Sequence, residues 1–264
     1  MELANLYKLN YGAFSLHLLS AIGLIITFSI IRKSANFNTN LWTYKITSVG
    51  KDKKNIDLEA YEYLDVSTIS LEVLLVLIFL ITAFFHLYYA TDGFKSGFYK
   101  KELLLGYNRL RWLEYGITST LMMYLLVTLS GVKDFDAAFS LCMINFLLIS
   151  YGYFLETSTS DITKKLSLSL GFISLIFIWA VVFRNFGYRI TESKEAGENI
   201  PSWIYGVLIP MFFWWTSFGV VATIKYVRGG DPNKYEMWYI ILSYLSKAFM
   251  GYYFAFGILR DPPE

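Results

Sequence analysis

The chain has 264 residues, of which 55% are hydrophobic and only 17% are charged, and its mean hydropathy is +0.44. Soluble domains average about 45–50% apolar and about 25% charged residues, so this composition excludes an ordinary soluble domain and favours a membrane protein. The net charge of +2 arises from 23 basic and 21 acidic residues, which gives no support for a nucleic-acid partner. Cys142 is the single cysteine, so no intrachain disulfide can form.

Seven apolar stretches of about 20 residues follow one another, and each is long enough to cross a hydrocarbon core about 30 Å thick. They cover residues 11–31, 69–91, 106–130, 137–155, 166–184, 201–227 and 235–259. The first lacks the basic start and small-residue cleavage pattern of a signal peptide, so we expect it to be retained. Because most connections are short, we expect one domain over residues 1–264, an all-α membrane protein with a seven-helix bundle.

The long connection, residues 32–68, has a pattern of its own. Residues 41–49 alternate bulky and polar side chains, a polar stretch follows at 50–55, and residues 56–64 alternate again. This pattern predicts a β-hairpin outside the membrane.

The basic residues predict an orientation. Lys45, Lys51, Lys53 and Lys54 lie inside the long connection, far from both flanking helices. Once they are discounted, the side that holds the N-terminus carries more lysine and arginine near helix ends, which favours a cytoplasmic N-terminus and an extracellular long loop.

Lys247 lies near the middle of the last apolar stretch. A charged lysine at that depth costs at least about 2.5–3.5 kcal/mol, so an intramembrane lysine points to function, although a lysine that snorkels to the interface is the alternative. A buried neutral amine is the nucleophile that condenses with an aldehyde to form a Schiff base. Ser243, one helical turn earlier, can hydrogen-bond the resulting nitrogen.

A positively charged Schiff base buried in hydrocarbon requires an anion. Glu114 lies inside the third apolar stretch, at a depth that matches Lys247, and it is the only carboxylate deep in any predicted span. We therefore predict that it is the counterion; the alternative is a protonated carboxyl group that only caps a helix contact.

The run Arg111, Trp112, Leu113, Glu114, Tyr115 resembles the counterion motif of the microbial rhodopsins. The familiar pumps have Asp where this chain has Glu114, and a second Asp where it has Ser243. Together with four polar residues in the first, second and fourth stretches, this combination resembles the heliorhodopsins: His17, His86, Asn145 and Glu156. The resemblance implies all-trans retinal, a cytoplasmic N-terminus and a homodimer.

Both histidines fall inside apolar stretches, and isolated membrane histidines are often packing residues. Here they share the predicted cytoplasmic half with other polar residues, which favours a hydrated cavity that holds a proton transiently. The resemblance implies that they belong to a network that receives the Schiff-base proton. The predicted network comprises His17, His86, Thr82, Asn108 and Glu156.

Residues flanking the counterion and in the fourth and sixth stretches are predicted to surround the chromophore. They are Trp112, Tyr115, Ser119, Met122, Asn145, Leu148, Phe212, Trp215 and Phe218.

Three functions remain open at this point. The first is a photoreceptor, in which photoisomerisation of the retinal drives a slow conformational change that signals to an unknown cytoplasmic partner. The second is a light-driven or light-gated proton transporter. The third is a transporter or scaffold without retinal that uses Lys247 to hold an anionic substrate. No enzymatic activity and no metal site are expected.

The distribution of ionisable residues favours the first function. The predicted external half, residues 21–31, 73–80, 120–130 and 248–259, has no ionisable side chain apart from tyrosines. Leu125 stands where related pumps carry a proton-donor carboxylate. A pump needs hydrated or ionisable groups on both sides of the Schiff base, and this half lacks them.

Overall fold

The computed structural model describes residues 2–31, 36–49 and 56–260; residues 1, 32–35, 50–55 and 261–264 lie outside this description. The described part is mainly helical, with seven helices of at least 20 residues. These are α1 (Leu3–Ile31), α2 (Leu71–Ala90), α5 (Arg109–Leu129), α6 (Phe135–Thr157), α7 (Asp161–Glu195), α8 (Ser202–Arg228) and α9 (Pro232–Arg260). Two short helices, α3 (Asp92–Lys95) and α4 (Phe98–Leu104), lie in the connection between α2 and α5. The sequence analysis did not predict them.

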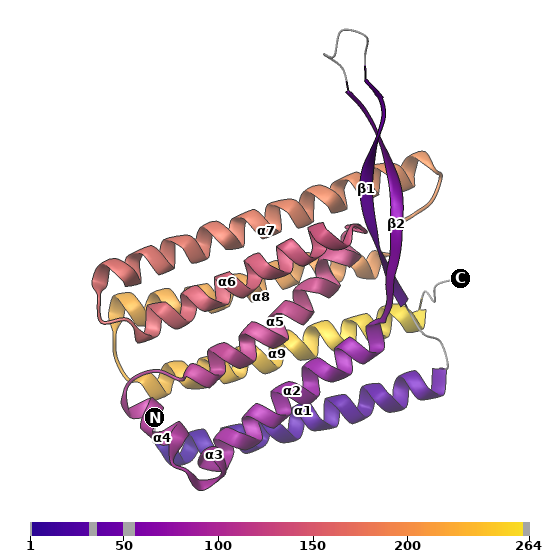
Figure 1. The fold of residues 1–264 in the computed structure, drawn as a ribbon. Helices are drawn as coiled ribbons and strands as arrows, with labels where there is room; N and C mark the ends of the chain where they lie inside the picture. The colour runs from indigo at the N-terminus through magenta and orange to yellow at the C-terminus, as the bar shows by residue number, and fades with distance from the viewer. Residues whose placement is uncertain (1, 32–35, 50–55, 261–264) are drawn as a thin grey trace.

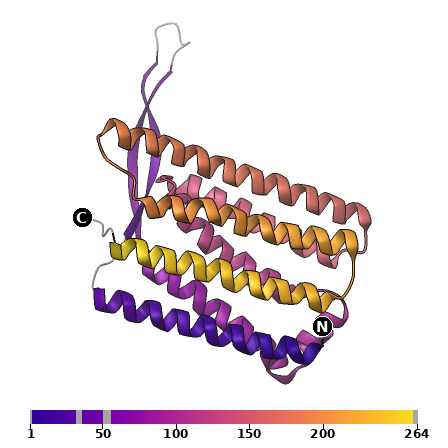
Figure 2. The ribbon, with the colours of Figure 1, turned by 180° about the vertical axis from the view of Figure 1, so that it is seen from behind.

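The long helices lie side by side in one bundle, seen from opposite sides in Figures 1 and 2. The start of α1 lies at one end together with α3 and α4, and the two strands lie at the other end. We call these the N-terminal end and the strand end. Because successive long helices run in opposite directions, the connections α6–α7 and α8–α9 also lie at the N-terminal end.

Five helices in the described part of the chain are long and apolar enough to cross a membrane: α1, α2, α6, α7 and α8. Their outward faces expose large apolar side chains, such as Leu19 at 64% and Phe213 at 64%, as an integral membrane protein requires. Helices α5 and α9 are not among the five. They carry ionisable residues, including Glu114 and Lys247, so the count of seven spans stays a prediction for these two.

Polar caps fix where several helices begin, as expected for N-terminal positions. The Asn108 side chain accepts a hydrogen bond from the backbone N–H of Arg111 (3.2 Å) at the start of α5. Asp134 accepts one from Ala137 (2.7 Å) at the start of α6. Two helices extend beyond the predicted spans, because hydropathy detects only the apolar part of a helix: α1 begins at Leu3 and α7 runs to Glu195.

Strands β1 (Asn36–Val49) and β2 (Ile56–Ser70) pair antiparallel, from Asn36 opposite Ser70 to Val49 opposite Ile56. Both contain the alternating segments that the sequence analysis identified, and both are longer. The predicted turn at 50–55 lies outside the described residues. The hairpin and its side of the membrane therefore stay predictions.

The bundle interior has two different halves. Toward the strand end it is filled by apolar side chains such as Leu75, Phe79, Leu126 and Phe254, each no more than 1% exposed. Toward the N-terminal end it contains buried polar and charged side chains. These include Asn10, His17, Thr82, His86, Glu102, Asn108, Arg111, Glu114, Glu236, Ser243 and Lys247, all 4% exposed or less. The chemistry of this protein is therefore concentrated in one half of its core.

Candidate functional site

The Lys247 amine and the Glu114 carboxylate meet in the core between α9 and α5. Lys247 Nζ lies 3.0 Å from Glu114 Oε1 and 2.7 Å from Ser243 Oγ. Ser243 lies one turn before Lys247 on the same face of α9, because an α-helix has 3.6 residues per turn. Lys247 is 3% exposed and Glu114 2%, so each charge is stabilised by the other and by hydrogen bonds rather than by bulk water.

Two threonine hydroxyls hold the carboxylate in place. Thr82 on α2 donates to Glu114 Oε1 at 2.9 Å. Thr118, one turn further along α5, lies 3.1 Å from the same oxygen and 2.9 Å from the Glu114 carbonyl oxygen. The sequence analysis placed Thr82 in the proton network, and the structure places it directly on the predicted counterion. Thr118 was missed, although its spacing of four residues from Glu114 puts it on the same helix face.

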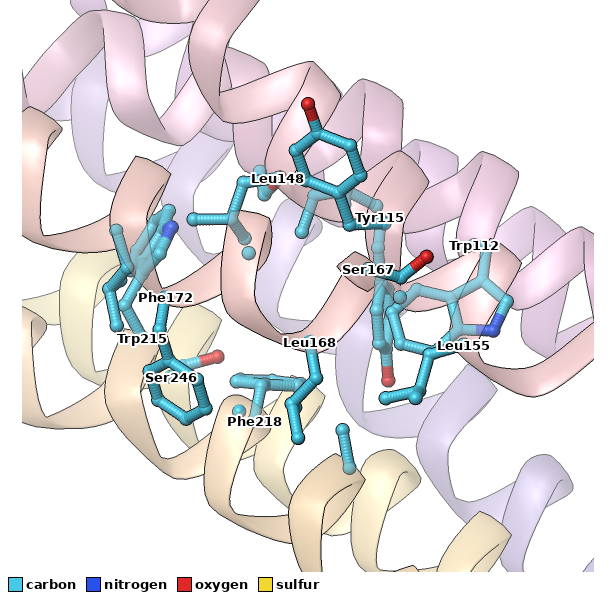
Figure 3. Close-up of a pocket in the computed structure, with 18 of the residues that line it drawn as sticks. Trp112, Tyr115, Leu148, Leu155, Ser167, Leu168, Phe172, Trp215, Phe218 and Ser246 are labelled. Atoms are coloured by element: carbon cyan, nitrogen blue, oxygen red, sulfur yellow. The ribbon is translucent and has the colours of Figure 1, made fainter. Parts of the chain in front are cut away.

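An apolar cavity lies between α5, α6, α7, α8 and α9 (Figure 3), and Lys247 is one of the residues that line it. Eight of the predicted chromophore residues line it: Trp112, Tyr115, Ser119, Met122, Leu148, Trp215, Phe218 and Lys247 itself. Ser243 and Glu114 do not line the cavity. They contact the amine at its end instead.

Two predicted lining residues lie elsewhere. Asn145 donates to Ser119 Oγ at 3.0 Å and accepts from Trp215 Nε1 at 2.9 Å, so it orients two lining side chains without lining the cavity. Phe212 packs against Trp179 and Phe183, with ring centroids 5.5 and 5.7 Å apart. It turns away from the cavity because Trp215, nearly one turn later, occupies that face of α8.

The α7 wall of the cavity was missed by the sequence analysis. It consists of Ser167, Leu168, Gly171, Phe172 and Leu175. The sequence signal for this wall was Gly171. Glycine is unfavourable inside a helix, so its presence there indicates close packing or open space. A Cβ at Gly171 would have only Tyr151 within 4 Å, at 3.9 Å.

Gly152 shows the opposite use of a glycine. A Cβ there would lie 2.2 Å from the Trp112 ring. The indole can therefore approach α6 this closely only because this position has no side chain. Gly152 thus determines where Trp112 stands in the cavity wall.

A second group of buried charges lies closer to the N-terminal end. Arg111 forms ion pairs with Glu236 and with Glu156 (2.5 Å to Glu156), and Lys225 pairs with Glu156 at 2.6 Å. Trp112 Nε1 donates to Glu156 at 2.7 Å. We call Arg111, Glu156, Lys225 and Glu236 the four-charge cluster.

Glu236 is a second buried carboxylate that the sequence analysis did not single out; it lies near the start of α9 and is 2% exposed. The sequence held a signal for it. Glu236, Ser243 and Lys247 are spaced by seven and four residues and therefore share one face of α9.

The predicted proton network divides into separate groups. His17 and His86 stack with ring centroids 5.4 Å apart and planes at 9°. Asn108 instead donates to Glu236 at 2.8 Å, and Glu156 belongs to the four-charge cluster. Both nitrogens of His17 and Nε2 of His86 are buried and have no hydrogen-bond partner among the described residues, as expected of polar atoms that water satisfies.

Neither the two histidines nor the buried carboxylates gather into a metal site in the part of the chain that the structure describes. Within residues 2–31, 36–49 and 56–260 no group of three His, Cys, Asp or Glu side chains could hold a metal ion.

We predict that Glu236→Ala lowers the free energy of unfolding by about 3–5 kcal/mol, because removing one partner of a buried ion pair leaves the other charge uncompensated. Lys165→Ala is the matched control, since Lys165 pairs with Asp161 (2.8 Å) at the exposed start of α7, where ion pairs contribute little. Unfolding in mixed micelles measures both. Equal losses in the two variants would contradict the role of Glu236.

Comparison with known proteins gives a family and a fold. The heliorhodopsin family model matches residues 6–259, and no significant match was found among curated protein sequences. The light-driven proton pump LR (Mac) from Leptosphaeria maculans has a similar structure, with a TM-score of 0.67 at 14% identity over 99% of this chain and 98% of that one. Exiguobacterium sibiricum rhodopsin gives a TM-score of 0.65 at 14% identity over 98% of both chains.

A third similar structure is the transmembrane domain of Salpingoeca rosetta rhodopsin phosphodiesterase. Its TM-score is 0.66 at 12% identity, over 97% of this chain and 85% of that one. At such low identities these three likenesses establish the rhodopsin fold and nothing finer.

Proposed function

The chain belongs to the heliorhodopsin family, which implies a retinal chromophore, and on that premise we propose that it is a photoreceptor whose Lys247 carries all-trans retinal as a Schiff base. Glu114 is the proposed counterion. The observation that carries this proposal is the buried contact of 3.0 Å between Lys247 Nζ and Glu114 Oε1, at the end of an apolar cavity. The Lys247 amine stands for the Schiff-base nitrogen.

The cavity fits such a group. Retinal is a long apolar polyene with one aldehyde, so it needs an apolar channel and one buried amine. Trp112, Trp215, Phe218 and Phe172 supply aromatic walls. A Cβ at Gly219 would lie 3.4 Å from Phe172, so glycine there leaves width between α7 and α8.

The bound group supplies light absorption and a change of shape; the chain supplies the electrostatics. Glu114, held by Thr82 and Thr118, balances a positive charge at the Lys247 nitrogen. Ser243 accepts a hydrogen bond from that nitrogen. The stacked His17 and His86 have unpartnered nitrogens within the described residues, and we propose that this half of the bundle takes up the proton that leaves the Schiff base.

The apolar strand-end half of the core favours a sensor over the alternative, a light-driven or light-gated proton transporter. Most of the residues that fill it are buried and apolar, among them Leu75, Phe79, Leu126 and Phe254. Water is poorly held among such side chains, so a proton released toward the N-terminal end should return from that end. The family is not generally enzymatic, and we propose no catalytic activity.

The function is tested in voltage-clamped cells that express the protein with all-trans retinal, by recording absorption and light-induced current together. A visible absorption band with only small transient currents supports a sensor. Sustained current that follows the proton gradient would support the transporter instead, and a colourless protein would favour a retinal-free transporter or scaffold that binds an anionic substrate.

We further propose that the N-terminal end is cytoplasmic, where a signalling partner would bind, and that the protein is a homodimer. Strands β1 and β2 form a two-stranded sheet, and such a pair is marginally stable alone. Its free edges could pair with a second copy of the chain. Crosslinking in mild detergent tests this, and a protein that stays monomeric would contradict it.

Lys247→Ala should abolish visible absorption while the protein still inserts in the membrane, because the only buried amine at the cavity is gone. Lys234→Ala, at an exposed position on the same helix, is the control and should stay coloured. Absorption spectra of the purified variants decide the matter, and a coloured Lys247→Ala protein would disprove the attachment site.

Glu114→Gln should shift the absorption band to longer wavelength, or remove it as the nitrogen loses its proton at neutral pH. Both effects follow from loss of the compensating negative charge. The exposed Glu198→Gln should keep the wild-type spectrum. Should the spectrum of Glu114→Gln also be unchanged at every pH, another anion must be the counterion.

Orientation is tested with single cysteines in a Cys142→Ser background. Lys165 and Glu198 are exposed at opposite ends of the bundle. An impermeant thiol reagent added to intact cells should label Glu198→Cys and spare Lys165→Cys until the cells are opened. The reverse pattern would place the N-terminus outside.

A further inference from the structure

Asn10 on α1 lies fully buried between His86 on α2 and Tyr99 on α4. Its Nδ2 lies 2.9 Å from the Leu6 carbonyl oxygen and 3.1 Å from the Tyr99 hydroxyl, and its Oδ1 lies 2.8 Å from His86 Nδ1. A carbonyl oxygen only accepts hydrogen bonds, so the atom facing Leu6 must be the amide nitrogen. This contact fixes which way round the amide sits.

The amide in turn fixes the histidine. Because Asn10 Oδ1 can only accept, His86 Nδ1 must carry the hydrogen. A neutral imidazole has one N–H group, so His86 Nε2 holds a lone pair. Nε2 is buried without a hydrogen-bond partner in the described part of the chain, and it is therefore free to accept a proton.

The same chain of hydrogen bonds continues to the four-charge cluster. The Tyr99 hydroxyl accepts from Asn10, so its own hydrogen is donated to Glu236 Oε1 at 3.2 Å. Glu236 is ion-paired with Arg111. Every donor between His86 and Glu236 thus points toward the carboxylate.

We propose that Asn10 and Tyr99 are positioning residues that hold His86 as the Nδ1–H tautomer and couple its charge to the Arg111–Glu236 ion pair. This inference rests on the proposed function, because the proton that reaches His86 is the one lost from the Lys247 nitrogen. The lone pair of His86 Nε2 takes that proton and the ring becomes an imidazolium. The nitrogen on Lys247 becomes neutral, and no proton passes through the amide.

The coupling follows from the strength of charge-assisted hydrogen bonds. A positive imidazolium strengthens its Nδ1–H bond to Asn10, and hydrogen bonds in a chain polarise one another at low dielectric. The bond from Tyr99 to Glu236 therefore strengthens as well. Arg111 pairs with both Glu236 and Glu156, so a stronger bond from Tyr99 to Glu236 shifts the ion pairing of Arg111 toward Glu156. The N-terminal end of the bundle thereby responds to the charge of His86.

The competing account is that Tyr99 only packs against its neighbours. A variant at Tyr89 distinguishes this account from the proposed positioning role. The Tyr99 ring stacks on Tyr89 with centroids 5.0 Å apart, and both are buried. The Tyr89 hydroxyl has no hydrogen-bond partner among the described residues. Tyr89→Phe therefore removes a hydroxyl from the same stack without touching the chain to Glu236.

The first measurement is made in the dark and does not depend on a light response. Nitrogen-15 NMR of the two histidines, assigned with His17→Phe, should show dark-state His86 protonated at Nδ1 and unprotonated at Nε2. Asn10→Leu should convert it to a mixture of tautomers. His86 found as the Nε2–H tautomer in the wild type would overturn the proposal, and so would an unchanged single tautomer in Asn10→Leu.

The second measurement is light-minus-dark infrared spectroscopy of the full retinal-bound protein, with the Glu236 carboxylate band assigned by Glu236→Gln. Tyr99→Phe should reduce that band at least about threefold, because the hydroxyl that donates to Glu236 and passes on the polarisation is gone, while Tyr89→Phe should retain it. A Tyr99→Phe band equal to wild type would overturn the coupling. A wild-type protein that stays colourless would refute the proposed function instead, and the dark NMR result would still stand or fall by itself.

Discussion

The pairing of one buried amine with one buried carboxylate constrains the rest of this molecule. Lys247 and Glu114 are both almost fully buried and 3.0 Å apart, and removing either would leave a lone charge that the core cannot stabilise. Helices α9 and α5 must therefore keep their register. Ser243, Thr82 and Thr118 complete the hydrogen bonds, and the cavity can be apolar because these groups satisfy the charges at its end.

The uneven core follows from this pair. Polar groups placed around it cannot be buried without partners, and the N-terminal half supplies them from α1, α2, α4, α5, α6, α8 and α9. The strand-end half buries fewer polar groups, among them Glu72 at 9% exposed and Ser130 at 0%, and it is packed mainly with apolar side chains such as Leu75 and Phe254. Under the proposed function, the uptake of the Schiff-base proton would therefore take place in the N-terminal half.

Sequence patterns predicted most of this architecture because the dominant signals are local. Hydropathy located the long helices, and the spacing of Glu114, Ser243 and Lys247 identified groups that the structure brings within hydrogen-bonding distance. The ends of α1 and α7 were misplaced, because a helix does not stop where its apolar residues stop. The hairpin stays a prediction, and strands β1 and β2 extend beyond the alternating segments on which it was based.

The parts that could not be predicted depend on which helices touch. Glu236 was overlooked because it lies near a helix start, where a carboxylate usually faces solvent; here it is buried against Arg111, Asn108 and Tyr99. Gly171 and Phe172 line the cavity because α7 packs beside α6. Asn108 and Glu156 were grouped with the histidines by depth, yet depth does not give rotation about a helix axis, and the structure places both on the four-charge cluster.

Aromatic rings separate the two groups of charges. Arg111 lies over the Tyr239 ring at 4.1 Å and Lys247 over the Tyr115 ring at 5.2 Å, and the Tyr115 hydroxyl donates to the Tyr239 carbonyl oxygen at 2.8 Å. Each cation is thus stabilised by a ring face. The chain of hydrogen bonds through Asn10 and Tyr99 instead uses α1 and α4, so charge can be sensed across the bundle without opening the aromatic layer.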